Sequence, residues 1–248
     1  MSHPLPKDAK RRRIFLMRHG SVTYFGADGR PVRPDTVPLN ANGRAQAQAA
    51  GKLFAAAKIA FDRVITSGLE RTIQTAAGVL QQMGQRVEIE TLPAMREIVG
   101  GSLADIPDDA LRDAFLGALD GQSGGHTAAD KRFLGGESIG ELLQRVTPEI
   151  DKLRVDPDWD IVLLVLHGGV NRAVLSYLLT GERQFFGGFA QSAGCINAID
   201  VGELKHDVTL RMVNQAPLDA LQVSTRMTTM EALYEQYLKF RSKGKIDV

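Results

Sequence analysis

The sequence predicts an α/β fold with a mixed, mostly parallel sheet covered by helices on both faces. Three segments repeat one order, a short apolar run, a polar or glycine-rich turn and a stretch of helical periodicity, which is the pattern of a βα unit. The runs are apolar throughout, which is typical of strands buried on both faces. Two later strand-like runs flank a short polar turn, which predicts an antiparallel hairpin.

The first βα unit begins with a strand over 13–17 and continues through a long loop that contains three prolines. Helical periodicity follows, with apolar residues at positions 45, 49, 53 and 56 on one face. Asn40 and Asn42 are both suitable N-cap residues, so we expect the helix to begin at one of them.

The second unit is predicted over 63–83 and the third over 161–179. In both units a short apolar strand ends in a polar turn, and a helix with regularly spaced leucine and isoleucine residues follows. The predicted strands and turns are 63–66 with Ser67 and Gly68, and 161–166 with His167 to Gly169.

Further strands are predicted over 86–91, 195–201 and 208–213, the last two forming the hairpin. Apolar residues at helical spacing predict a helix over 137–153, which Pro148 is expected to kink or split. A C-terminal helix is predicted over 228–240, with Thr228 or Thr229 as its cap.

Between about 100 and 136 the periodic pattern gives way to glycines and acidic residues, with one short helix predicted over 111–119. Long irregular segments in compact domains are often lids or binding loops. We therefore expect a lid-like insertion at the sheet edge, within a single domain that spans residues 1–248. The basic residues of segment 1–12 are expected to form a solvated tail.

The composition is that of an ordinary globular protein, with 44% hydrophobic and 24% charged residues. A net charge of +1 gives no general attraction to nucleic acid or membranes. The single cysteine, Cys195, excludes an internal disulfide framework, and the apolar run 161–166 is far shorter than the roughly 20 residues that span a bilayer. We expect a cytoplasmic protein with no nucleic-acid or membrane partner; the oligomeric state stays open and a homodimer is allowed.

Unusual polar residues follow each of the three predicted strands. In an open α/β sheet, ligands bind outside the carboxyl ends of the parallel strands, so these residues are expected to converge. They are Arg18 and His19 after the first strand, Ser67 and Arg71 after the second, and His167 with Gly168 and Gly169 after the third.

These residue types suit a phosphoryl group. Guanidinium groups match phosphate oxygens and helix N-termini offer free N–H groups, so Arg18, Arg71 and a donating His167 could neutralise the anion while His19 attacks phosphorus. A divalent metal fits poorly beside two arginines without clustered carboxylate or histidine ligands. We therefore expect no metal and no other cofactor, and an activity that is indifferent to chelators.

Several segments, in this order and spacing, resemble the histidine phosphatase superfamily in its phosphoglycerate-mutase-like branch. The resemblance spans most of the chain and implies a three-layer α/β/α sandwich whose mostly parallel sheet has one antiparallel edge strand. The segments are FLMRHGS, PLNANGRAQAQAAGKLF, DRVITSGLERTIQTA, the weaker MREIVGG, GGESIGELLQRV and VLLVLHGGVNRAVL.

The resemblance also implies roles for individual residues. His19 would become a phosphohistidine, and Arg18, Arg71 and His167, with Gly168 beside them, would hold the phosphoryl oxygens. Glu97 falls where the family has its general acid, which protonates the leaving alkoxide and later takes a proton from water. From the residues alone, Glu97 could equally be a surface carboxylate paired with Arg96.

The sequence departs from the family pattern at two places. Phe25 stands where many members have an asparagine, and Thr23 could replace that phosphate contact. The residues after Glu97 also differ, which leaves three aspartates open as the acid. They are Asp105, Asp108 and Asp109.

The function that these features favour is a metal-independent phosphomonoester hydrolase acting on a small phosphorylated substrate. Two alternatives stay open: a cofactor-dependent mutase, and a binding module that recognises phosphorylated ligands without catalysis. The HGGVNR turn resembles phosphatase members more than mutases, which usually carry asparagine after HG. The leaving group is not identified; candidate contacts, with solvated loop residues as the alternative, are Arg30, Arg33, His126, Lys131 and Arg132.

Overall fold

One six-stranded sheet organises the part of the chain that the computed structural model describes, which is residues 11–26, 32, 34–117, 119, 126–223 and 226–244. The strand order is β3-β2-β4-β1-β5-β6. The strands are β1 (Arg12–Arg18), β2 (Arg63–Thr66), β3 (Ile89–Thr91), β4 (Ile161–Leu166), β5 (Ile196–Val201) and β6 (Val208–Gln215). β1 to β4 pair in parallel, whereas β5 pairs antiparallel with β1 and with β6. The predicted mixed sheet, with antiparallel pairing at one edge, is confirmed.

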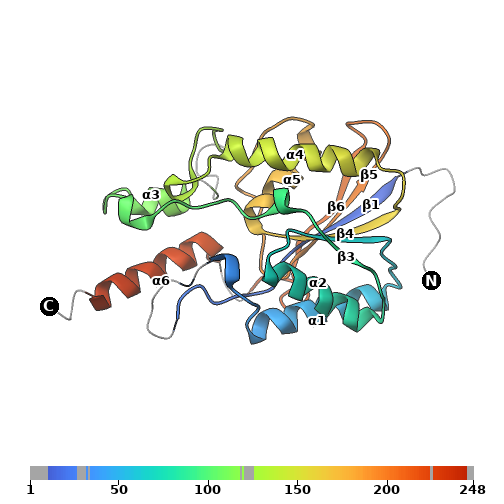
Figure 1. The fold of residues 1–248 in the computed structure, drawn as a ribbon, viewed down its shortest axis with the longest axis horizontal. Helices are drawn as coiled ribbons and strands as arrows, with labels where there is room; N and C mark the ends of the chain where they lie inside the picture. Colours follow the sequence, from blue (N-terminus) through green and yellow to red (C-terminus); the bar gives the residue numbers. More distant parts are fainter. Residues whose placement is uncertain are drawn as a thin grey trace.

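Helices cover both faces of this sheet. The helices are α1 (Ala41–Ala56), α2 (Glu70–Met83), α3 (Leu111–Leu116), α4 (Ile139–Val155), α5 (Gly168–Thr180) and α6 (Thr229–Gly244). Figure 1 shows α4 and α5 on one face and α1 and α2 on the other, while α3 and α6 lie beyond one end of the strands. The arrangement is the predicted three-layer α/β/α sandwich.

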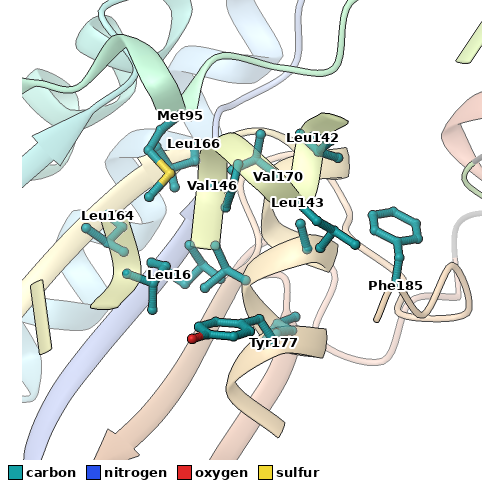
Figure 2. Packing of buried hydrophobic residues seen from close by; sticks show 14 of the residues in the cluster. Leu16, Met95, Leu142, Leu143, Val146, Leu164, Leu166, Val170, Tyr177 and Phe185 are labelled. Carbon is teal, nitrogen blue, oxygen red and sulfur yellow. The ribbon is translucent and has the colours of Figure 1, made fainter. Parts of the chain in front are cut away.

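The central strands β1, β2 and β4 are buried on both faces, as their continuous apolar sequence predicted. In β1, Ile14 and Leu16 pack into the core cluster under α4 and α5, and Phe15 and Met17 into the cluster under α1 and α2. Figure 2 shows the first cluster, where Leu16 lies among residues of β4, α4 and α5. Because both faces are filled with apolar side chains, polar side chains gather at the strand ends.

Caps fix where the helices begin. The Asn40 side chain accepts a hydrogen bond from the backbone N–H of Gly43, so Asn40 and not Asn42 caps α1. At α6, Thr228 and Glu231 each accept a hydrogen bond from the other's backbone N–H, which makes Thr228 the cap.

Three predicted elements differ in extent. β3 has only three residues, because it pairs solely with Val64 to Thr66 of the short strand β2. The helix predicted over 111–119 ends at Leu116. Pro148 does not split α4, which runs unbroken from Ile139 to Val155; the proline removes one helical hydrogen bond, and buried side chains on either side hold the helix to the core.

Basic residues at the start of the described chain contact the folded domain. Residues 1–10 lie outside the described residues, but the arginines at 11 to 13 contact the folded chain. Arg11 pairs with Asp207 at 2.6 Å and Arg13 with Asp200 at 2.6 Å, and the Arg12 guanidinium lies 4.2 Å from the centre of the Trp159 ring. The expectation of a solvated tail over 1–12 was therefore wrong for Arg11 and Arg12, whereas Arg13 lies in β1 as predicted. Within the described ranges, no helix is long and apolar enough to cross a membrane.

Candidate active site

The register of the parallel strands brings the polar strand ends together. Arg18 at the end of β1 pairs with Leu166 at the end of β4, and the backbone N–H of His19 donates to the Leu166 carbonyl at 2.9 Å. The next residue along β4 is His167, whose ring centre lies 5.2 Å from that of His19. Two imidazoles from segments far apart in the sequence thus meet at one edge of the sheet.

His19 is buried, with 2% of its surface exposed, and its ring has a defined orientation. The Nδ1 atom lies 2.7 Å from the Gly20 carbonyl oxygen. Because a carbonyl can only accept, Nδ1 must carry the proton and Nε2 the lone pair of the neutral ring. Burial, then the charges of Arg18 and Arg71, hold the pKa of His19 well below its usual value of 6.5, so the ring is neutral near pH 7.

Two glycines allow the loop after His19 to pass close to α1. A Cβ atom on Gly20 would lie 2.4 Å from the Gly43 carbonyl oxygen, and one on Gly43 would lie 2.1 Å from the Ser21 oxygen. Both distances are too short for real atoms. The Gly20 N–H also donates to Thr75 Oγ1 of α2 at 3.0 Å, so the carbonyl that orients His19 is itself fixed.

His167 is the N-cap residue of α5 and is fully buried. Its Nε2 forms a 2.8 Å hydrogen bond with Ser67 Oγ at the end of β2. Its Nδ1 is buried without a hydrogen-bond partner in the described chain. Burial and the nearby His19 and Arg71 keep the pKa of His167 well below 6.5. The ring therefore offers one nitrogen to a ligand.

Arg18 and Arg71 supply positive charge around the two rings. Arg18 is 7% exposed, and its Nη1 donates to the Gln191 carbonyl at 2.5 Å and to Thr229 Oγ1 at 2.8 Å. The buried Arg18 Nε has no hydrogen-bond partner in the described chain. Arg71 is 2% exposed in the first turn of α2, and its charge lowers the pKa of both histidines.

Gly168, the first residue of α5, lies beside Arg18. A Cβ atom added to it would be 3.5 Å from Arg18 Nε. The N-terminus of α5 thus lies beside the Arg18 guanidinium.

The Glu97 side chain lies against the N-terminus of α5, next to Gly169. Its carboxylate accepts hydrogen bonds from the backbone N–H of Gly169 at 3.1 and 3.2 Å and of Val170 at 3.3 Å. A Cβ atom on Gly169 would lie 2.7 Å from Glu97 Oε1, so glycine is needed for this approach. Glu97 is thus held to a buried helix end, and the alternative of a surface pair with Arg96 is not observed.

The three aspartates that remained as alternative acids lie elsewhere. Asp108 is bound to Arg241 by two hydrogen bonds of 2.7 and 3.1 Å. Asp105 is exposed and lines a hollow of about 460 Å³ within the insertion. Asp109 is also exposed. None of their observed contacts reaches the paired imidazoles.

Thr23 and the described leaving-group candidates are exposed, unlike the residues of the buried cluster. Thr23 is exposed and accepts from Asn40 Nδ2 at 3.4 Å, while Phe25 is half-buried. His126 and Lys131 are exposed. Arg132 is exposed and donates to Glu141 and to the Gly136 carbonyl. Arg30 and Arg33 lie outside the described residues.

Four residues around the site were not predicted from the sequence as site residues. Gln191 and Thr229, which contact Arg18, are 173 and 211 residues away from it in the chain, and no local pattern marks them. Glu137 and Arg145, which hold the segment around Glu97, lie within the quoted GGESIGELLQRV stretch, and that was the available signal.

The arrangement can bind a tetrahedral anion and attack it. Two buried guanidinium groups and a helix N-terminus surround a neutral imidazole whose Nε2 lone pair is unprotonated. Among the described residues no group of three or more His, Cys, Asp or Glu side chains could hold a metal ion. The fold and this set of groups are those of an α/β phosphoryl-transfer enzyme.

Comparison with known families agrees with this class of enzyme. Residues 14–214 match the histidine phosphatase superfamily (branch 1), and the chain belongs to this superfamily. Its relatives are phosphatases and phosphoglycerate-mutase-like enzymes, and a phosphohistidine mechanism is general for the family.

Individual relatives cover most of the chain. Over 207 residues it is 30% identical to the adenosylcobalamin/alpha-ribazole phosphatase of Salmonella typhimurium, which covers 82% of this chain and 96% of that protein. It is 31% identical over 166 residues to a Salmonella paratyphi A protein named probable phosphoglycerate mutase, with 67% of this chain and 74% of that protein covered. The crystal structure of the alpha-ribazole phosphatase from Shigella flexneri superposes with a TM-score of 0.62 at 25% identity, covering 86% of this chain and all of that one.

Proposed function

We propose that this protein is a metal-independent phosphomonoester hydrolase that passes the phosphoryl group through His19. The observation that supports this most strongly is the 2.7 Å bond from His19 Nδ1 to the Gly20 carbonyl in a buried, cationic setting. It leaves Nε2 unprotonated, and a neutral imidazole nitrogen is the form that can attack phosphorus. A module that only binds phosphate needs no such nucleophile.

In this proposal the phosphoryl oxygens are held by Arg18, Arg71 and His167. The free Nε of Arg18 and the free Nδ1 of His167 are buried polar atoms that a bound phosphoryl group would satisfy. Gly168 brings the α5 N-terminus to the same point. Fixed positive charge of this kind stabilises the charge that builds on the equatorial oxygens during transfer.

Glu97 is proposed as the general acid and base. In the first step Nε2 of His19 bonds to phosphorus, the P–O ester bond breaks, and the leaving oxygen takes a proton from Glu97. In the second step water attacks phosphorus and the N–P bond breaks, with Glu97 taking the water proton. The products are an alcohol, inorganic phosphate and the original enzyme.

We also propose that the insertion over 100–136 and α6 form the lid that contacts the leaving group, within a single domain spanning the chain. Phe115 of α3 packs against Tyr234 and Tyr237 of α6, with ring centres 5.3 and 5.5 Å apart. The N-terminus of α6 in turn contacts Arg18 through Thr229. This chain of contacts connects the insertion to the phosphate-binding group.

Hydrolysis is favoured over phosphoryl isomerisation. The turn after β4 reads HGGVNR, with glycine at position 169 where mutases usually carry asparagine, and this glycine is what admits Glu97 to the α5 N-terminus. The relative matched along 96% of its length is named a phosphatase. Efficient isomerisation of phosphoglycerate that depends on a bisphosphate primer would contradict the proposal.

The experiment combines a substrate panel with rapid quench. Release of inorganic phosphate is measured from alpha-ribazole 5′-phosphate, 3-phosphoglycerate and p-nitrophenyl phosphate, with and without EDTA, and EDTA should change none of the rates. Rapid quench with a labelled substrate should trap an acid-labile phosphoenzyme that is absent in His19→Ala.

His206→Ala is a suitable control, because His206 is exposed in the turn between β5 and β6, which lies at the end of β1 away from His19. The phosphoenzyme should form normally in this variant. Label that persists in His19→Ala would rule out His19 as the nucleophile, and loss of turnover with EDTA that one divalent cation restores would rule out a metal-independent reaction.

A further inference from the structure

The segment that contains Glu97 is held by an ion pair from another element. Arg145 of α4 and Glu137, which comes two residues before α4, form a bidentate pair: Nε to Oε1 at 2.6 Å and Nη2 to Oε2 at 2.9 Å. Only 26% of the Arg145 side chain and 12% of the Glu137 side chain is exposed. Planar, paired contacts of this kind have one well-defined geometry.

Arg145 uses its remaining N–H groups on the backbone around Glu97. Its Nη1 donates to the carbonyls of Ala94 at 2.6 Å and Arg96 at 2.8 Å, and its Nη2 to that of Glu97 at 3.3 Å. One guanidinium group thus spans three carbonyls of a four-residue stretch. A lysine ammonium could not reproduce this pattern, because it is a point charge with three donors.

Glu137 holds the same segment from the other side. Its Oε2 accepts from the Val99 N–H at 2.9 Å, and its own N–H donates to the Val99 carbonyl at 2.8 Å. The next residue, Ser138, caps α4 in a reciprocal capping box with Glu141. The start of α4 and the segment through Val99 therefore have fixed relative positions.

Buried side chains complete the attachment of this segment. Met95 and Ile98, on either side of Glu97, are 2% and 4% exposed in the core cluster under α4 and α5, where Figure 2 shows Met95 near Leu166. The carboxylate itself is received by the N–H groups of Gly169 and Val170. Every restraint on Glu97 converges on one side-chain position at the N-terminus of α5.

We propose that Arg145 and Glu137 are positioning residues that hold Glu97 at the distance from the leaving oxygen that proton transfer requires. The inference rests on the proposed function, since it assigns the support of the acid used there. Neither residue touches substrate in this account. Their effect is exerted through Glu97, because catalytic groups must be held within about 0.5 Å of the productive geometry to act efficiently.

This role has a signature that a purely structural role lacks. A leaving group that is stable as an anion, such as p-nitrophenolate, gains little from proton donation, whereas an alkoxide depends on it. Displacement of Glu97 should therefore lower kcat/KM for an alkyl phosphate and leave that for an aryl phosphate nearly unchanged. General loss of structure would lower both.

The experiment compares kcat/KM for β-glycerophosphate and p-nitrophenyl phosphate in Glu97→Gln, Arg145→Lys and Glu137→Gln. Glu97→Gln should lower the alkyl value by about 10²- to 10⁴-fold. Arg145→Lys and Glu137→Gln should lower it by about 10- to 100-fold, the size expected of a displacement near 1 Å. The aryl value should change by less than about threefold in all three variants.

Arg63→Lys provides a matched control. Arg63 also makes a bidentate pair, with Glu90 at 2.8 and 2.6 Å, and a third bond to Asp156 at 2.6 Å. Its side chain is 25% exposed, close to the value for Arg145, but it lies at the start of β2, at the opposite end of the strand from Ser67. Its replacement should lower both rates equally or neither.

A double variant tests whether Arg145 acts through Glu97. If it does, Arg145→Lys added to Glu97→Gln should cause no further loss with the alkyl substrate, because the group that Arg145 positions is already gone. Additive losses would overturn the inference. So would equal losses of the alkyl and aryl rates in Arg145→Lys and Glu137→Gln, with unchanged melting temperatures.

The outcome for Glu97→Gln separates the inference from the proposed function. Equal losses with both substrates in that variant would remove Glu97 as the acid, and with it this inference. Selective loss in Glu97→Gln but wild-type alkyl rates in Arg145→Lys and Glu137→Gln would overturn the inference alone. A wild-type protein that releases phosphate from neither substrate would overturn both.

Discussion

The strand-end cluster and the insertion hold their polar groups in opposite ways. The strand-end cluster, which is Arg18, His19, Arg71 and His167, is at most 7% exposed. Each imidazole in it has one nitrogen bound to a neighbouring group. The charged residues of the insertion lie in water instead, and the Asp108 side chain is 70% exposed even though it is paired with Arg241.

The difference shows how each region is specified. Buried polar groups need fixed partners, and the strand ends supply them at positions that the sheet register dictates. The described part of the insertion packs on α6 through the aromatic contacts of α3, and its described charged side chains lie at the surface. Changes in the strand-end cluster should therefore impair the reaction with every substrate, and changes in the insertion should have small effects that depend on the substrate.

Of the substitutions that compare these two regions, Arg71→Lys should have the largest effect. The lysine keeps the charge but loses the planar fork, so kcat/KM should fall by about 10- to 100-fold, the cost of one or two hydrogen bonds to a charged group. The loss should be similar for aryl and alkyl phosphates, because Arg71 is proposed to hold the group that is common to both. Phosphate release from both substrates is the measurement.

Arg11→Lys is the control for this substitution, because Arg11 pairs with Asp207 on the surface beside β1. Its turnover should match that of the wild type. Unchanged turnover in Arg71→Lys would place Arg71 outside the site, and the strand-end cluster would lose one of its four members.

The second prediction concerns pH and stability. Both histidines have folded-state pKa values well below 6.5, so between those values and 6.5 the unfolded chain binds more protons than the folded one. Their contribution to stability is therefore complete above pH 6.5 and is lost as the pH falls below it. The slope is at most about 1.4 kcal/mol per pH unit for each histidine.

Urea unfolding at pH 7.5, 6.5 and 5.5 measures this slope. The double variant His19→Gln, His167→Gln should show a flatter dependence, and the exposed His126→Gln should keep that of the wild type. If the double variant lost stability as steeply as the wild type below pH 6.5, the buried imidazoles would not be the source of the pH dependence.

Much of the fold could be predicted because its signals are local. A strand that is apolar throughout, such as 161–166, followed by a glycine turn and an apolar helix face, has few alternatives to a buried parallel strand. The meeting of His19 and His167 was inferred from the rule that ligands bind at the carboxyl ends of parallel strands; that β1 and β4 are neighbours is a long-range feature that no local signal marks. Pro148 does not split α4, because tertiary packing holds the helix together around the missing hydrogen bond.

The remaining site contacts have no local signal. Thr229 and Gln191 contact Arg18 only because folding brings these distant positions together. The Glu97 carboxylate is held by the backbone N–H of Gly169, which is 72 residues away in the chain. Asp105, Asp108 and Asp109 could not be separated from Glu97 in the sequence, since carboxylates in a loop look alike until their neighbours are known.

The third prediction tests the bond from Arg18 Nη1 to Thr229 Oγ1, which joins the strand-end cluster to α6. Thr229→Val keeps the shape and removes the acceptor, while Gln191 still holds the same nitrogen. We expect kcat/KM to fall by about 3- to 10-fold, with recovery in Thr229→Ser. Equal losses in the valine and serine variants would mean that the hydroxyl is not what orients Arg18.

The smallest effect is expected from Asp108→Asn in the insertion. Its partner Arg241 lies on the surface of α6, and exposed ion pairs contribute little because water screens them. Turnover of p-nitrophenyl phosphate should stay within about twofold of the wild type, and the melting temperature should fall by less than about 2 °C. Arg241→Gln should behave the same, and the double variant should equal either single one. If either substitution instead lowered turnover of p-nitrophenyl phosphate by the amount expected for Arg71→Lys, the position of α3 on α6 would control the phosphoryl site itself, and the separation between the two regions would not hold.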